Sequence, residues 1–152
     1  MEKRFSVRRV RASDLDRILQ IEKASFGVDA YDRKLFAEYT RMCGELFLVA
    51  LGGTKVHGYA LACLCAGKAE NRAELVSLAV DPAMLGKGAA QALMDSILRR
   101  LKLRGVVRFS LTVKVTNTRA IAFYKNYGFR KLRRAPGYYE DASDGLIFVK
   151  DL

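Results

Sequence analysis

Long apolar runs are absent from this sequence of 152 residues, and so are clusters of metal-binding side chains. No run reaches eighteen apolar residues, so we expect no membrane-spanning helix and no membrane partner. Residues 1–6 contain no apolar signal-peptide core, and we therefore expect a cytoplasmic protein. His57 is the single histidine and lies apart from any Cys, Asp or Glu cluster, so no metal site is expected.

Proline and cysteine are both scarce. Pro82 and Pro136 are the only prolines, and the sequence has no repeat, low-complexity tract or linker, which indicates one compact unit. The three cysteines are Cys43, Cys63 and Cys65, an odd number. Cys63 and Cys65 stand two residues apart in an apolar run, and strain argues against a bridge between them. We expect buried, reduced thiols.

Basic residues are in excess. The chain has 27 Lys and Arg against 16 Asp and Glu, a formal net charge of +11. Such a balance favours anionic partners, among them nucleic acid, a ribosome, an anionic membrane or a phosphorylated cofactor. A solvated basic face is the simpler explanation for the two densest groups. These groups are Arg99, Arg100, Lys102, Arg104 and Arg108, and then Arg130, Lys131, Arg133 and Arg134.

The hydrophobic pattern predicts an α/β fold. We expect strands near residues 5–11, 46–51, 56–66, 73–80, 106–113, 129–139 and 146–150. Ser13 to Asp16 has the form of a capping box that starts a helix, and further helices are expected near residues 33–42, 89–104 and 118–127. Residues 67–72 form a polar loop between two strands. One helix between the strands at 73–80 and 106–113 makes a βαβ unit, so these strands should be parallel.

A glycine-containing loop precedes the longest predicted helix. Leu85-Gly86-Lys87-Gly88 lets the backbone approach a ligand closely, and the first helical amides have no internal partners. The helix dipole adds partial positive charge there, which suits a pyrophosphate. The loop matches neither the Walker pattern nor the dinucleotide fingerprint. An ordinary strand-to-helix turn is the alternative.

Two motifs carry a family resemblance. Glu74 to Pro82, followed by Leu85-Gly86-Lys87-Gly88-Ala89-Ala90, resembles the coenzyme-A motif Q/R-x-x-G-x-G/A of the GNAT acetyltransferase superfamily. Downstream, Asn117, Ala120, Phe123-Tyr124 and Gly128-Phe129 are similar to the family signature N-x-x-A-x-x-h-Y-x-x-x-G-F. The motifs stand in the family's order and spacing, and the resemblance covers most of the chain.

This resemblance implies a fold and a cosubstrate. The fold is one GNAT-like α/β domain over residues 1–152, with a mixed sheet of about six to seven strands, about four flanking helices and two parallel strands splayed near Val80. The cosubstrate is acetyl-CoA, without a metal, and Tyr124 stands at the position of the family's general acid. The expected cofactor contacts are Leu78, Ala79, Val80, Leu85, Gly86, Lys87, Gly88, Ala89, Ala90, Asn117, Ala120, Phe123 and Tyr124.

Two further segments resemble a subfamily. Ile21-Glu22 with Ser25-Phe26, and Gly137 to Asp141, are similar to protein N-terminal α-amine acetyltransferases, including the bacterial ribosomal-protein-alanine enzymes and their archaeal relatives. The resemblance implies a protein N-terminus as acceptor, with ribosomal proteins among the candidates. The residues expected to contact the acceptor are Phe26, Tyr31, Tyr138 and Tyr139.

Three positions depart from the family pattern. Leu85 replaces the usual Gln or Arg that opens the phosphate loop, and Lys87 is the nearest compensating charge. Thr112 stands where the bacterial ribosomal-protein enzymes carry a glutamate often assigned as the base. Asp29-Ala30-Tyr31 replaces a Pro-Trp pair in the peptide-binding loop of many relatives. The last two departures bear on the acceptor.

The reaction sets modest demands on a base. A thioester is already activated, and a protein α-amine with a pKa near 8 is about one-tenth neutral at pH 7, whereas a lysine amine near 10.4 is neutral in less than about one part in a thousand. Glu74 is the candidate base, because relatives carry a catalytic Tyr or His at this strand and burial would raise its pKa. A solvated glutamate at the strand end is the alternative for Glu74, and core packing is the alternative for Tyr124.

Two other functions remain open on the sequence. An acetyltransferase for a small amine is the first, although such pockets are usually acidic and the chain is basic. A coenzyme-A-binding or nucleic-acid-binding module without turnover is the second, and Leu85 and Thr112 keep it open. RNA binding that weakens with salt, without acetyl transfer, would indicate the second.

Overall fold

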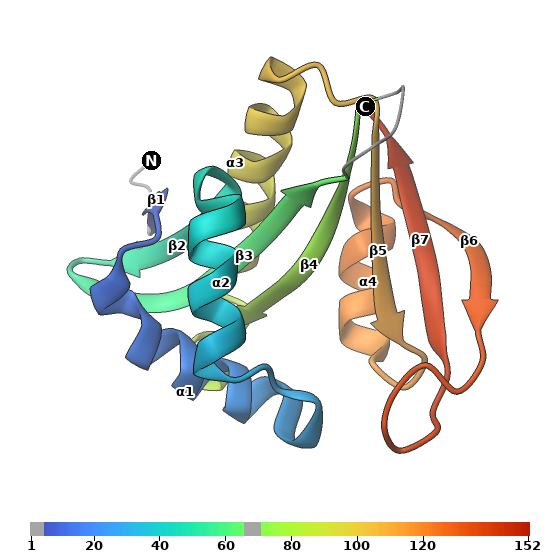
Figure 1. Cartoon of the computed structure of the whole chain (residues 1–152), viewed down its shortest axis with the longest axis horizontal. Coiled ribbons are helices and arrows are strands. Elements are labelled where there is room, and N and C mark those ends of the chain that lie inside the picture. Colours follow the sequence, from blue (N-terminus) through green and yellow to red (C-terminus); the bar gives the residue numbers. More distant parts are fainter. Residues whose placement is uncertain (1–4, 66–70) are drawn as a thin grey trace.

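A computed structural model describes residues 5–65 and 71–152 of the chain (Figure 1). A seven-stranded sheet runs through it in the order β1-β2-β3-β4-β5-β7-β6. The β4–β5 pair is parallel and the other pairs are antiparallel. Helices α1 and α2 cover one face of the sheet, and α3 and α4 cover the other. The predicted mixed α/β domain is therefore confirmed.

The elements follow the predicted order. The strands are β1 (Ser6–Arg9), β2 (Phe47–Gly52), β3 (Lys55–Leu64), β4 (Arg72–Val80), β5 (Arg108–Lys114), β6 (Arg130–Ala135) and β7 (Gly145–Asp151). The α-helices are α1 (Leu15–Phe26), α2 (Arg33–Cys43), α3 (Ala89–Leu103) and α4 (Thr118–Asn126). Short 3₁₀ turns are η1 (Ala12–Asp14), η2 (Gly27–Asp29), η3 (Gly44–Leu46) and η4 (Pro82–Met84).

Several predicted boundaries differ from the observed ones. The strand expected at residues 129–139 ends at Ala135, because Pro136 has no N–H to continue the ladder. Tyr138 and Tyr139 consequently lie in the β6–β7 loop. The polar loop expected at residues 67–72 falls mostly outside the described residues. No helix in the described part of the chain is long and apolar enough to cross a membrane.

The start of α1 differs from the capping box predicted at Ser13 and Asp16. Asp14, in the turn η1, accepts a hydrogen bond from the backbone N–H of Arg11 at 2.7 Å. The same carboxylate forms an ion pair with Arg8 of β1 at 2.8 Å. The contact with β1 holds Asp14 inward, so the helix begins only at Leu15. The capping-box prediction was wrong because it took no account of the ion pair between Asp14 and Arg8 of the neighbouring strand.

The parallel strands β4 and β5 separate halfway along their length. They are paired from Arg72–Arg108 to Leu75–Leu111 and not beyond, and Figure 1 shows them diverging below this point. The sequence had predicted the separation near Val80, but it begins after Leu75, five residues earlier. Val76 forms a bulge against β3, because Leu61 pairs with Ser77 and Ala62 with Leu75.

Two of the three cysteines form a disulfide, which corrects the prediction of buried, reduced thiols. Cys43, at the end of α2, is bonded to Cys63 on β3, with Cα atoms 5.3 Å apart. Cys65 is free but exposed. The pattern gave no sign of the bond, because the packing of α2 on the sheet brings together cysteines 20 residues apart.

Candidate active site

Two cavities lie where the strands separate. The first, here named the α3–α4 cleft, has a volume of about 360 Å³ and lies between the end of β4, the start of α3 and α4. The second, named the splay chamber, has a volume of about 340 Å³ and lies between α1, the diverging strands and the β6–β7 loop. Both cavities are lined by Ser25, Phe26, Leu78, Asn117, Ala120 and Tyr124. The two spaces therefore meet at the separation of β4 from β5.

The α3–α4 cleft contains the predicted phosphate-binding loop. Gly88, with φ of 100°, adopts a left-handed conformation that disfavours any other residue. The first backbone bond of α3 runs from Ala92 N to Gly88 O at 3.0 Å, so the amides of Ala89, Ala90 and Gln91 have no intrahelical acceptor. Free amides at a helix start, together with the helix dipole, have the chemistry that suits an anion.

Most predicted cofactor residues line this cleft. They are Leu78, Ala79, Val80, Leu85, Gly86, Gly88, Ala89, Ala90, Asn117, Ala120, Phe123 and Tyr124. Lys87 is the exception, since it is not part of the lining. Asn117 also accepts a hydrogen bond from Ala120 N at 3.2 Å and so caps α4. The backbone of Leu78 to Val80 lies on the part of β4 that is unpaired with β5.

Arg119 is a cleft residue that the sequence analysis missed. Its side chain comes from the first turn of α4 and lines the cleft. Its Nη2 atom lies 3.8 Å from the position that a Cβ at Gly86 would take. The guanidinium thus stands over the phosphate-binding loop, where Leu85 brings no polar group. The signal was present, because Arg119 lies between Asn117 and Ala120 of the second motif.

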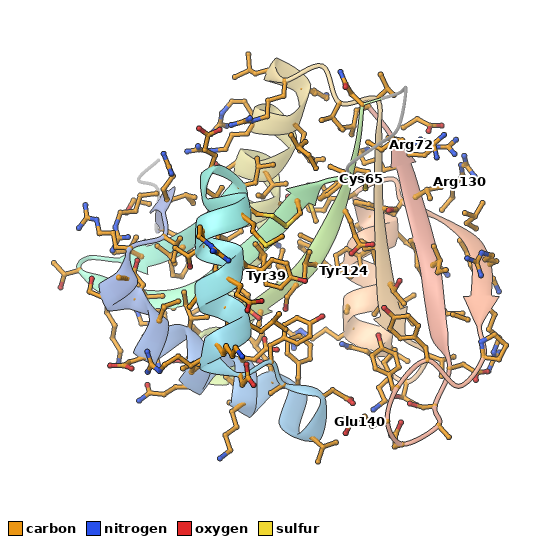
Figure 2. All side chains as sticks on the ribbon, in the orientation of Figure 1. Tyr39, Cys65, Arg72, Tyr124, Arg130 and Glu140 are labelled. Atoms are coloured by element: carbon orange, nitrogen blue, oxygen red, sulfur yellow. A yellow bond between two sulfur atoms is a disulfide. The ribbon has the colours of Figure 1, made fainter. Side chains whose placement is uncertain are left out.

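Tyr124 lies at the junction of the two cavities. It projects from α4 beside the opening between β4 and β5 (Figure 2). Its ring packs edge-on against Phe123 and Phe129, and burial raises the pKa of its hydroxyl. Within the described residues no side chain or backbone group forms a hydrogen bond to that hydroxyl. Tyr124 is therefore both a core residue and a protonated donor facing the cavities.

Glu74 lines the splay chamber from β4. Leu75 and Val80 both pack into the core under α3 and α4, which strict alternation over five residues would forbid. The bulge at Val76 resets the alternation, so Glu74 and Ser77 face the α1 side together. Glu74 is an exposed residue, in line with the alternative of a solvated glutamate, and partial burial raises the pKa of its carboxyl.

Glu22 is a second carboxylate of the chamber that the sequence analysis did not single out as a site residue. The side chain, on α1, is only 1% exposed. Its oxygens accept hydrogen bonds from the hydroxyl of Tyr59 and, at 2.9 Å, from the backbone N–H of Tyr31. Burial raises the pKa of Glu22, while these bonds act in the opposite direction. An acidic residue on the apolar face of α1 was the available signal.

The predicted acceptor residues all line the splay chamber. Phe26 and Tyr31 come from the α1–α2 region, and Tyr138 and Tyr139 from the β6–β7 loop. Gly145 makes room for this loop, because a Cβ there would stand 2.8 Å from Thr112 and 3.4 Å from Tyr138. Thr112 is itself part of the lining. The chamber thus has aromatic side chains on two of its walls and carboxylates on its α1 side.

No cluster of three or more His, Cys, Asp or Glu side chains suited to a metal ion occurs within the described residues. The described residues that line the two cavities offer backbone amides, one guanidinium, one lysine amine, tyrosine hydroxyls and carboxylates. Such a set suits binding of a phosphorylated ligand on one side and of an amine on the other.

Comparison with known proteins identifies the family to which this arrangement belongs. Residues 15–129 match the model of the acetyltransferase (GNAT) family. An N-alpha-acetyltransferase of Saccharolobus solfataricus is 27% identical over 97% of this chain and 93% of its own length. The crystal structure of Ard1 from Thermoplasma volcanium superposes with a TM-score of 0.92 at 25% identity, covering 99% of both chains.

A bacterial structure agrees. The ribosomal-protein-S18-alanine N-acetyltransferase of Escherichia coli has a TM-score of 0.82 at 25% identity, over 97% of this chain and 93% of its own. The family model spans three quarters of the chain and includes the phosphate-binding loop and the segment from Asn117 to Phe129. This protein therefore belongs to the GNAT family of acetyltransferases.

Proposed function

We propose that this protein transfers the acetyl group of acetyl-CoA to the α-amine of a protein N-terminus. The observation that carries the proposal is the meeting of the α3–α4 cleft and the splay chamber at Tyr124. A thioester that reaches through the cleft would end beside an amine that enters through the chamber. The names of the archaeal and bacterial relatives support an α-amine as acceptor, and a ribosomal protein is one candidate.

The cofactor half of the mechanism depends on backbone groups. The amides at the start of α3 would bind the diphosphate, with Arg119 as the charged partner. The unpaired edge of β4 from Leu78 to Val80 offers N–H and C=O groups to the pantetheine arm, as a neighbouring strand would. A backbone N–H at this edge would polarise the thioester carbonyl as negative charge develops on its oxygen.

The acceptor half needs a neutral amine. Glu74, whose pKa is raised by burial, is the proposed base, acting directly or through a water molecule. Glu22 lies in the same chamber and is a second carboxylate able to take the proton. After attack on the thioester carbonyl, the carbon–sulfur bond breaks and coenzyme A leaves as a thiolate. Tyr124, protonated at neutral pH, would donate a proton to that sulfur.

Acetylation of defined acceptors tests this proposal. Peptides with a free N-terminus, the same peptides with a blocked N-terminus and one lysine, and spermidine would be incubated with acetyl-CoA and followed by mass spectrometry. We expect acetylation of the free α-amine at a rate at least about 100-fold above that of the lysine, because the lysine amine is far less often neutral. Comparable rates on lysine would overturn the α-amine assignment.

The same experiment also tests the small-amine alternative, which one observation favours. The carboxylates of the splay chamber would also suit a free polyamine. Faster transfer to spermidine than to any peptide would favour that alternative. RNA binding without any acetyl transfer would favour the module without turnover.

The cytoplasmic location also stays a prediction. The disulfide between Cys43 and Cys63 argues for surroundings that do not reduce this bond.

A further inference from the structure

The splay chamber has the opposite charge to the protein as a whole. The chain carries a formal net charge of +11. Among the described residues, the charged side chains that line the chamber are nevertheless three carboxylates, Glu22, Asp29 and Glu74, and a single amine, Lys114. A local surface of this kind acts on a bound acceptor at short range, whereas the net charge acts at long range and is screened by salt.

The single amine is already neutralised. Lys114 Nζ lies 2.9 Å from Asp29 Oδ2 and 3.0 Å from Asp141 Oδ2, and it also stands 5.2 Å from the ring centre of Tyr139. Asp29 belongs to the α1–α2 region and Asp141 to the β6–β7 loop, so Lys114 joins the two walls of the chamber. Its charge is therefore used within the protein and is not offered to an acceptor.

The other two carboxylates have no cationic partner in the described part of the chain. Glu22 is held by hydrogen bonds from neutral donors, and Glu74 forms no ion pair there. Burial first, and then Tyr39, Tyr138, Glu22 and Glu74, raises the pKa of Tyr31 to about 12, so both carboxylates act on this side chain. Two uncompensated carboxylates therefore face the space beside the acceptor amine.

We propose that the splay chamber selects acceptors by charge, excluding N-termini with Asp or Glu in the first residues and accepting neutral or basic ones. This inference rests on the proposed function. A carboxylate brought into the chamber would meet Glu22 and Glu74 at short range without a free cation to pair with, and such unpaired contacts are the usual means of rejecting a wrong partner. An ammonium or guanidinium group would instead be attracted.

Three peptides that differ only in charge test the selection. They begin Ser-Ala-Ala, Ser-Glu-Glu and Ser-Lys-Lys and share one neutral continuation, and kcat/KM is measured at about 0.15 M salt, where long-range attraction is screened. We expect the Glu peptide to react at least about tenfold more slowly than the Ala peptide, and the Lys peptide at least as fast. Equal or faster reaction of the Glu peptide overturns the selection.

The Ala peptide separates the two proposals. Its acetylation supports the proposed function whatever the Glu peptide does, whereas no transfer to any of the three peptides rejects the proposed function and the selection together.

A matched pair of variants on one loop locates the effect. Asp141→Asn removes one of the two partners of Lys114, so the amine becomes available to an acidic acceptor. We expect the Ala-to-Glu ratio of kcat/KM to fall by about threefold or more. Glu140→Gln makes the same change of charge one residue earlier, at an exposed side chain that does not line the chamber (Figure 2). It should leave the ratio unchanged, and an equal fall in both variants would overturn the local selection.

Discussion

Tyr124, whose hydroxyl has no hydrogen-bond partner among the described residues, stands where the two cavities join. Since burial raises the pKa of Tyr124, its hydroxyl stays protonated across the working pH range and is able to give a proton to the leaving thiolate. Tyr124→Phe should lower kcat by roughly 10- to 100-fold, because only the donor is lost and the ring packing on Phe123 and Phe129 remains. Calorimetry should give unchanged affinity for acetyl-CoA. Full activity of the Phe variant would refute the role of the hydroxyl.

Glu74 sets the expected pH dependence. A base acts in its ionised form, and burial raises the pKa of Glu74 above its usual value of 4.5. The rate should therefore rise as the pH increases through this raised pKa, and rise again as the α-amine loses its proton near pH 8. Glu74→Gln should remove the first rise and slow turnover by roughly 10- to 100-fold. A Glu74→Gln variant with the same kinetics as the wild type between about pH 6 and 9 would exclude Glu74 from the mechanism.

Arg119 offers a test of cofactor binding. Charged hydrogen bonds to phosphate contribute about 1.5–3 kcal/mol. Arg119→Ala should therefore raise the KM for acetyl-CoA by roughly 10- to 100-fold with little change in kcat. Lys87→Ala is the control, since Lys87 carries the same charge and belongs to the phosphate-binding loop itself but does not line the cleft. A larger effect at Lys87 would show that the loop lysine binds the phosphates, as the sequence had predicted.

At the scale of elements, regular periodicity made most of the fold predictable. The apolar stripe of α3 and the alternation in β5 depend on local sequence, and both elements lie within about two residues of their predicted places. The parallel pairing of β4 and β5 followed from the single crossover helix. The bulge at Val76 was not predictable, because it depends on the register with β3 and leaves no mark in a run of apolar residues.

In the site, too, features set by local sequence were predictable and features set by contacts between elements were not. The positions of Gly88 in the cleft and of Tyr124 at the junction were predictable, because both belong to motifs with fixed spacing. The positions of Arg119 and Glu22 in the cavities were missed, since they depend on which side chains reach across from a neighbouring element. Lys87 was expected at the phosphates from its neighbours in sequence, yet its side chain does not line the cleft. Contacts between elements are the information that periodicity lacks.

The disulfide joins two elements and should stabilise the fold. It closes a loop of 20 residues between α2 and β3, and the restriction of the unfolded chain is worth about 3 kcal/mol. Reductant should therefore lower the free energy of unfolding by about this amount. Urea unfolding with and without dithiothreitol measures it.

Two variants serve as controls for this measurement. Cys43→Ala should lose the sensitivity to reductant, whereas Cys65→Ala should retain it, because Cys65 takes no part in the bond. A wild-type protein whose unfolding does not respond to reductant would contradict the prediction.

At the scale of the whole molecule, charge is divided between two regions of the fold. Residues 82–139, which include α3, β5, α4 and β6, contain thirteen of the 27 basic residues and a single acidic one, Asp95. This segment accounts for the entire positive excess of the chain. It also supplies most of the α3–α4 cleft, whereas the acidic side chains of the splay chamber come from outside it. The two substrates would therefore meet fields of opposite sign.

Salt should consequently act in opposite directions on the two substrates. Raising the salt from about 0.05 to 0.5 M shortens the screening length from more than about 10 Å to less than about 5 Å. Attraction of acetyl-CoA to the basic segment then weakens, and its KM should rise several-fold. The short-range repulsion of an acidic acceptor should weaken as well, so kcat/KM for a peptide that begins Ser-Glu-Glu should rise, while a neutral peptide changes little. A fall in kcat/KM for the acidic peptide over this range would mean that the net charge of the protein, and not the chamber, governs how acceptors are received.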